Sequence, residues 1–147
     1  MSMMSDKLKF LLCVVCFFVL VDRVSAGQIA VIVHHSVQTD SLDKARLVDI
    51  YTLNSGLWDD KAKIHVVDIK GEPDIKKKFY KAMDVSLRDM RRIWLRKLLS
   101  GKAIPPKAFK TQEEVVREVA SAPGLIGYVD AANVTAEVRV IYTINDD

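Results

Sequence analysis

The turn that would join a buried strand to a helix at residues 68–76 has residue types and spacing suited to binding chemistry. It follows an apolar run and contains Lys70, Gly71 and Lys76, with Pro73 at the expected first helical position. Open α/β sheets bind ligands beside the carboxyl ends of their strands, and unpaired amides at a helix amino end favour anions. The turn therefore predicts a site for a small anion.

The sequence offers no arrangement typical of a catalytic centre. It contains no Gly-x-Ser-x-Gly, no nucleotide-binding glycine loop and no His-x-x-x-His. His34 and His35 are adjacent, so their side chains would point to opposite faces of a strand end, which disfavours a shared metal. Cys13 and Cys16 lie inside an apolar run, where a redox or metal site is not expected. We therefore expect a protein that is not an enzyme and that uses no metal or cofactor.

The elements that must position the turn follow from apolar runs, caps and stop signals. Buried strands are predicted near residues 28–33, 64–69, 125–129 and 138–142. Helices are predicted near residues 41–53, 74–83, 86–99 and 111–122. Strands that alternate with helices indicate one α/β domain with a mixed sheet flanked by helices.

Several residues mark the ends and faces of these elements. Asp40 is expected to cap the first helix, and Thr111 with Glu114 forms a capping box for the last. After that helix, Gly124 can adopt the left-handed turn, and Gly127 allows a close approach of another segment to its strand. The helix at 86–99 has two predicted faces. The buried stripe comprises Leu87, Met90, Trp94 and Leu98. The basic, solvated stripe comprises Arg88, Arg92 and Arg96.

The amino terminus has the three-part pattern of a secretory signal. Lys7 and Lys9 precede an apolar run over residues 10–21, and Val24 and Ala26 supply the small residues of a cleavage site. The run is shorter than the roughly 20 residues that a membrane span needs. We interpret residues 1–26 as a cleaved signal peptide and 27–147 as the domain, with an uncleaved membrane anchor as the alternative. This predicts a periplasmic or secreted protein with no membrane span after cleavage.

Charge is unevenly distributed along the chain, although the whole sequence has a net charge of only +3. Residues 70–110 carry 13 Lys or Arg and 4 Asp or Glu, whereas both flanks are acidic. These segments could pack together and neutralise one another, or the middle could form a positive face for an anion or an acidic partner protein. The low net charge of an exported chain disfavours nucleic acid as a partner.

The order of these features resembles the phosphate-binding-protein-like family, the solute-binding proteins of phosphate ABC transporters. The matching pieces cover nearly all of residues 28–142: 29–33, 47–51, Trp58, 76–79, Trp94, Gly101, Pro106, 114–116 and 123–129. The resemblance implies a type II periplasmic-binding-protein topology, a phosphate or other oxyanion ligand and an ABC transporter as partner. Binding proteins of this family have two lobes, and this chain has the length of a single-lobe short form.

The matching turn departs from the family's phosphate turn, which is rich in Gly, Ser and Thr and ends in Arg. Pro73 removes an amide donor, Glu72 and Asp74 add negative charge, and Lys76 stands where the Arg would be. On this reading the anion donors are Lys70, Gly71 and Lys76, joined by Ser36 or Thr39 from the first loop. We therefore expect an exported solute-binding-like protein with weak oxyanion binding. The alternative is a non-transport interaction module that docks an acidic partner through its basic face.

Overall fold

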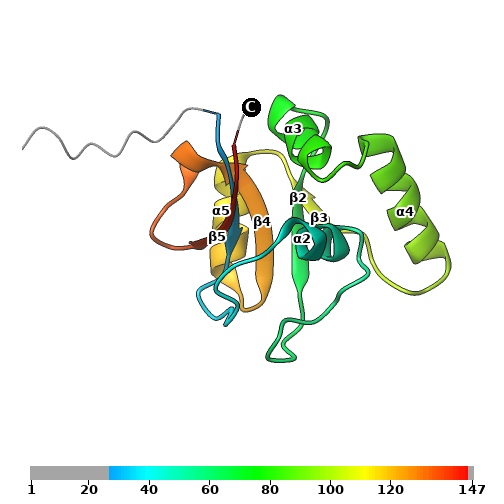
Figure 1. Ribbon diagram of the computed structural model, residues 1–147, viewed down its shortest axis with the longest axis horizontal. Helices are drawn as coiled ribbons and strands as arrows, with labels where there is room; N and C mark the ends of the chain where they lie inside the picture. Colours follow the sequence, from blue (N-terminus) through cyan, green and yellow to red (C-terminus); the bar gives the residue numbers. More distant parts are fainter. Residues whose placement is uncertain (1–26, 146–147) are drawn as a thin grey trace, which may run out of the picture.

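The protein is built around one five-stranded mixed sheet (Figure 1). The structure is a computed structural model and describes residues 27–145. Its strands are β1 (Ile29–Val33), β2 (His65–Ile69), β3 (Lys107–Phe109), β4 (Leu125–Asp130) and β5 (Arg139–Ile144). The helices are α2 (Lys44–Tyr51), α3 (Asp74–Ala82), α4 (Leu87–Leu99), α5 (Gln112–Ser121) and the 3-10 helix η1 (Ala131–Asn133). The predicted α/β class is confirmed, whereas the predicted signal peptide at 1–26 lies outside the described residues.

The direction of each strand decides which loops can meet. The sheet has the order β3-β2-β4-β1-β5; β2 is parallel to β3 and β4, whereas β1 is antiparallel to β4 and β5. The strands β2, β3, β4 and β5 therefore all end at one edge, which we call the carboxyl edge. The strand β1 ends at the opposite edge. The loop that follows β1 and the loop that follows β2 therefore lie at opposite ends of the strands.

The two faces of the sheet are covered by different helices. On one face, α5 packs against β4, where an added Cβ on Gly127 would come within 2.9 Å of a Val115 methyl group. The predicted close approach at Gly127 is therefore made by α5. On the other face, neighbouring residues of β4 point toward α2 and α3, because side chains alternate along a strand.

An aromatic cluster joins the second face to the three helices that cover it. Its members are Tyr51, Phe79, Tyr80, Trp94 and Tyr128. The rings of Phe79 and Tyr128 stack with centroids 3.8 Å apart, and the Trp94 Nε1 donates a hydrogen bond to the Tyr51 carbonyl over 2.7 Å. This bond fastens α4 to the end of α2, so the predicted burial of Trp94 is confirmed.

Three details differ from the sequence-based expectation. The segment at Lys107–Phe109 forms a short strand on β2, although the sequence indicated only an extended connector; three residues are too few to show alternation. The α2 helix is capped by Asp43 rather than Asp40, since the Asp43 carboxylate accepts from the Arg46 amide. Leu98 is 48% exposed, because α4 extends past the aromatic cluster after Trp94.

Within residues 27–145, no helix has the length and apolar character needed to cross a bilayer.

Candidate functional site

The turn between β2 and α3 lies at the carboxyl edge, as the sequence predicted. Gly71 adopts a left-handed conformation with φ of 74°, which lets the chain reverse between strand and helix. The Lys70 amide donates to the Phe109 carbonyl over 2.8 Å, tying the turn to the end of β3. Residues 70–74 are exposed, and Pro73 occupies the N-cap of α3 without a side-chain cap within the described chain. The helix end is therefore open to solvent.

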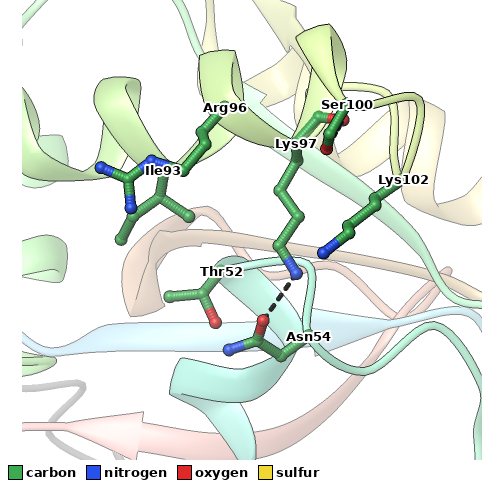
Figure 2. A pocket seen from close by; sticks show the side chains of 7 residues that line it. All are labelled: Thr52, Asn54, Ile93, Arg96, Lys97, Ser100 and Lys102. Carbon is green, nitrogen blue, oxygen red and sulfur yellow. Dashed lines mark hydrogen bonds between the residues drawn. The ribbon is translucent and has the colours of Figure 1, made fainter.

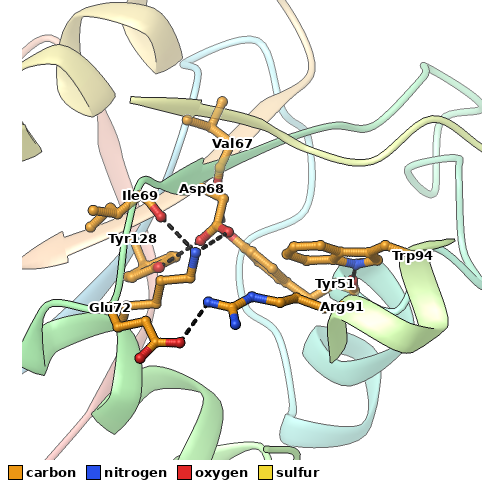
Figure 3. Close-up of polar contacts among 9 residues, drawn as sticks. Tyr51, Val67, Asp68, Ile69, Glu72, Arg91, Trp94 and Tyr128 are labelled. Atoms are coloured by element: carbon orange, nitrogen blue, oxygen red, sulfur yellow. Dashed lines mark hydrogen bonds and ion pairs between the residues drawn. The ribbon is translucent and has the colours of Figure 1, made fainter. Parts of the chain in front are cut away.

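Lys76 does not face this turn but points into the protein, where it is 7% exposed. Figure 3 shows its two partners, Asp68 and Ile69, beside Tyr128. Its ammonium lies 2.9 Å from an Asp68 carboxylate oxygen and donates to the Ile69 carbonyl over 2.7 Å. Because two buried acceptors already hold the charge, Lys76 is not available to an anion at the helix end. The donor role that we expected for Lys76 is thus not supported by its geometry.

A signal for this inward orientation exists in the sequence. Lys76 stands three, four and seven residues before Phe79, Tyr80 and Met83, all of which are buried. This spacing places Lys76 on the buried face of α3. The matching carboxylate is Asp68, which occupies a buried position of β2. A lysine on an apolar helical face and an aspartate inside an apolar strand together indicate a buried pair.

Tyrosine hydroxyls complete the environment of Asp68. The Tyr128 hydroxyl donates to the Asp68 carboxylate over 2.7 Å, and the Tyr51 hydroxyl donates to the Val67 carbonyl over 3.2 Å. Burial raises the pKa of Tyr51, Tyr80 and Tyr128, and the negative charge of Asp68 raises each pKa further. These three phenols therefore stay neutral, and those of Tyr51 and Tyr128 act as hydrogen-bond donors in the core. The network has the composition of a structural ion pair rather than of an open binding site.

The exposed acid of the turn has a partner that the sequence did not reveal. Arg91 on α4 donates to the Glu72 carboxylate over 2.7 Å. This hydrogen bond, more than any other influence, lowers the pKa of Glu72, so the carboxylate stays ionised. Arg91 thus brings a guanidinium to the mouth of the turn, where Glu72 occupies it. An external anion would have to compete with this internal carboxylate.

Ser36 and Thr39 lie away from the turn. They follow β1, which ends at the edge opposite to the carboxyl edge. The Ser36 hydroxyl lies 2.8 Å from the Nδ1 atom of His34, and the Thr39 hydroxyl donates to Asp59 over 3.1 Å. The predicted set is therefore divided: Lys70 and Gly71 lie together at the carboxyl edge, and Ser36 and Thr39 cannot join them.

The loops that follow β3 and β4 share the carboxyl edge with the turn, but their donors are already used. The Glu114 carboxylate accepts from the amides of Lys110 and Thr111, which confirms the predicted capping box. The Gln112 side-chain oxygen accepts from the Asp130 amide over 2.7 Å and from the Asn133 side chain over 2.8 Å. Compared with these two loops, the α3 end has fewer donors taken by internal bonds, although Glu72 competes for Arg91 there.

Comparison with solved structures places this fold beside phosphate-binding receptors. An ABC-type phosphate transport receptor from Vibrio cholerae matches 80% of this chain with a TM-score of 0.63 and 16% identity. A candidate phosphate ABC transporter substrate-binding protein from Clostridium perfringens, with bound phosphate, matches 80% with a TM-score of 0.66 and 17% identity. A possible phosphate binding protein from Planctomyces limnophilus matches 80% with a TM-score of 0.59 and 12% identity.

These matches confirm the predicted periplasmic-binding-protein-like fold. The chain spans 46%, 45% and 42% of the three matched proteins, respectively, as a partial, single-lobe fold. The search found no matching family model and no matching curated protein. The likeness therefore defines the class of fold, and the ligand has to be argued from this chain's own residues.

Proposed function

We propose that this chain is an exported solute-binding-like protein that contacts phosphate or a similar oxyanion only weakly at the β2–α3 turn. The observation that carries the proposal is the fold itself, which matches phosphate-binding receptors and places the turn at the carboxyl edge. Lys70 and the free amides that follow Gly71 supply attraction for an anion. The relation in fold makes an ABC transporter the expected partner, and binding rather than catalysis the expected activity.

The weakness of the site follows from its composition. An exposed helix amino end favours an anion by only about 0.3–1 kcal/mol. Lys76 is held by Asp68 and Ile69, and Glu72 and Asp74 bring negative charge to the same turn. Tight oxyanion sites combine several amides with a two-pronged cation, and here Arg91 is already bound by Glu72. We therefore expect a dissociation constant for phosphate no tighter than about millimolar.

Calorimetric titration of the purified chain with inorganic phosphate at low salt tests this proposal. Lys70→Gln should remove the part of the binding heat that comes from the turn, whereas Glu72→Gln should increase it because this change removes a competing carboxylate and releases Arg91. Lys81→Gln, which removes an exposed charge near the far end of α3, is the control. Micromolar binding that Lys70→Gln abolishes, or total binding that Lys70→Gln leaves unchanged, would contradict weak binding at the turn. The mass of the exported form should show cleavage after Ala26.

A second candidate function is docking of an acidic partner protein through α4. This helix exposes Leu95, Leu98 and Leu99, which are 54%, 48% and 79% exposed, beside the arginines of its basic stripe. Exposed leucines flanked by cations are typical of an interaction surface. Capture of a partner from the same compartment should weaken with salt and be lost in an Arg88→Glu/Arg92→Glu variant. Capture that is insensitive to both changes would argue against this function.

A further inference from the structure

A basic cavity lies between the carboxyl end of α4 and the loop after α2, and the activity proposed above does not use it. Its volume is about 260 Å³. Its lining residues come from residues 52–54 and 93–102 and comprise Thr52, Asn54, Ile93, Arg96, Lys97, Ser100 and Lys102 (Figure 2). We propose that this cavity binds a small oxyanion that carries two or more negative charges, such as phosphate or a short dicarboxylate.

The cations of this cavity lack the carboxylate partners that neighbouring cations have. On the same helix, Arg91 pairs with Glu72 and Arg92 with Asp89. Within residues 27–145, no carboxylate forms an ion pair with Arg96, Lys97 or Lys102. None of the residues that line the cavity is acidic. Three positive charges that share a small space repel one another, and a bound anion would relieve that repulsion.

Local backbone geometry gathers these side chains. Gly101, with φ of 70°, ends α4 in a left-handed turn, and the Lys102 amide then bonds to the Lys97 carbonyl over 2.9 Å. This reversal brings Lys102 back beside the last turn of the helix. On the opposite wall, Leu53 has φ of 62°, and the Asn54 amide bonds to the Asp49 carbonyl over 2.9 Å. Both walls are therefore fixed by backbone hydrogen bonds.

Side-chain hydrogen bonds orient part of the cavity and leave donors for a ligand. The Lys97 ammonium donates to the Asn54 side-chain oxygen over 2.6 Å and to the Leu53 carbonyl over 3.3 Å. Figure 2 shows Lys97 and Lys102 reaching from the end of α4 toward Asn54, while Arg96 extends across Ile93. An ammonium has three donors and a guanidinium five, and the Asn54 amide nitrogen adds two more. An oxyanion could thus meet donors from both walls.

The charge and size of the cavity narrow the class of ligand. The carboxyl end of α4 contributes a partial negative charge of about one half, which is small beside three full positive charges. Pockets for drug-sized molecules have volumes of roughly 300–1,000 Å³, so this cavity suits a smaller molecule. Ile93 and the methylene stems of the lysines add apolar surface, which accommodates the short carbon chain of a dicarboxylate as well as inorganic phosphate.

The test is titration of the isotopically labelled, purified chain with inorganic phosphate and, separately, with succinate at low salt, followed by amide NMR. We expect shifts at Asn54 and at residues 96–102. Arg96→Gln and Lys102→Gln should each weaken binding about tenfold, as expected for losing one charge-assisted donor. Arg88→Gln removes the same charge from the same helix about 12 Å away and should leave affinity within about twofold.

Comparing the affinities for phosphate and succinate shows whether the cavity prefers a phosphate group or a dicarboxylate. Binding of either anion at this cavity supports the proposal. Unchanged circular dichroism confirms that each variant is folded. Equal weakening by Arg88→Gln would indicate general charge attraction and would overturn the proposal. Shifts confined to Lys70 and Gly71, or no shifts at all, would also overturn it. Because Lys70→Gln tests the turn and Lys102→Gln tests the cavity, the two proposals can fail independently.

Discussion

Replacing Lys76 with methionine should destabilise this protein more than any other single lysine substitution on α3. Lys76 and its partner Asp68 are 7% and 2% exposed, and their charged atoms lie 2.9 Å apart. Methionine keeps most of the side-chain volume but removes the ammonium. The Asp68 carboxylate would then remain in the core with the Tyr128 hydroxyl as its hydrogen-bond donor.

The magnitude follows from the cost of an unpaired buried charge. Breaking a buried ion pair by removing one partner costs about 3–5 kcal/mol, which is a large share of a typical domain stability of about 5–15 kcal/mol. With a denaturant slope of about 1.5 kcal/mol per molar urea, the midpoint should fall by about 2–3 M. Urea unfolding followed by tryptophan fluorescence and circular dichroism measures this shift.

Two further variants separate the ion pair from other effects of the substitution. Lys77→Met changes the exposed neighbouring lysine and should alter stability by no more than about 0.5 kcal/mol. The double variant Asp68→Asn/Lys76→Met removes both charges and should recover about 2–3 kcal/mol of the loss. A cost below about 1 kcal/mol for Lys76→Met, or a double variant with simply additive losses, would refute the argument.

Three other predictions test the core and the turns by urea or pH titration. Gly71→Ala should lower the free energy of unfolding by about 1–2 kcal/mol, because only the left-handed conformation of Gly71 opposes a side chain. Gly124→Ala should cost more than about 3 kcal/mol, because its Cβ would also lie 2.2 Å from the Lys63 carbonyl oxygen. Equal costs for the two variants would contradict this prediction. Trp94→Ala should cost about 3–5 kcal/mol, and a loss below about 1 kcal/mol would mean that the aromatic cluster does not hold α4. The pKa values of the buried tyrosines are raised, so the unfolded chain releases their protons near pH 10 while the folded chain keeps them. The free energy of unfolding should therefore fall above about pH 10, by up to about 1.4 kcal/mol for each tyrosine and each pH unit. Tyrosinate absorbance should then appear together with unfolding, and titration of three tyrosines in the folded protein would contradict it.

The position of the candidate turn was predictable, whereas its chemistry was only partly so. Gly71 and Pro73 mark the end of one element and the start of the next within a few residues, so a local pattern was sufficient. The orientation of Lys76 was also encoded locally, in its spacing from Phe79 and Tyr80. The pairing of Glu72 with Arg91 could not be read in this way, because the two residues belong to different elements whose packing angle is set by the aromatic cluster.

The sequence by itself determined the helices, most of the strands, the capping box at Thr111 and the α/β class, because hydrophobic period, caps and glycine turns act over a few residues. Only the tertiary structure decided which loops meet. The antiparallel insertion of β1 beside β4 sends Ser36 to the edge opposite Gly71. The same long-range packing brings Asn54 beside Lys97 and so creates the basic cavity. Strand order and helix docking depend on contacts between distant parts of the chain, and no local spacing specifies them.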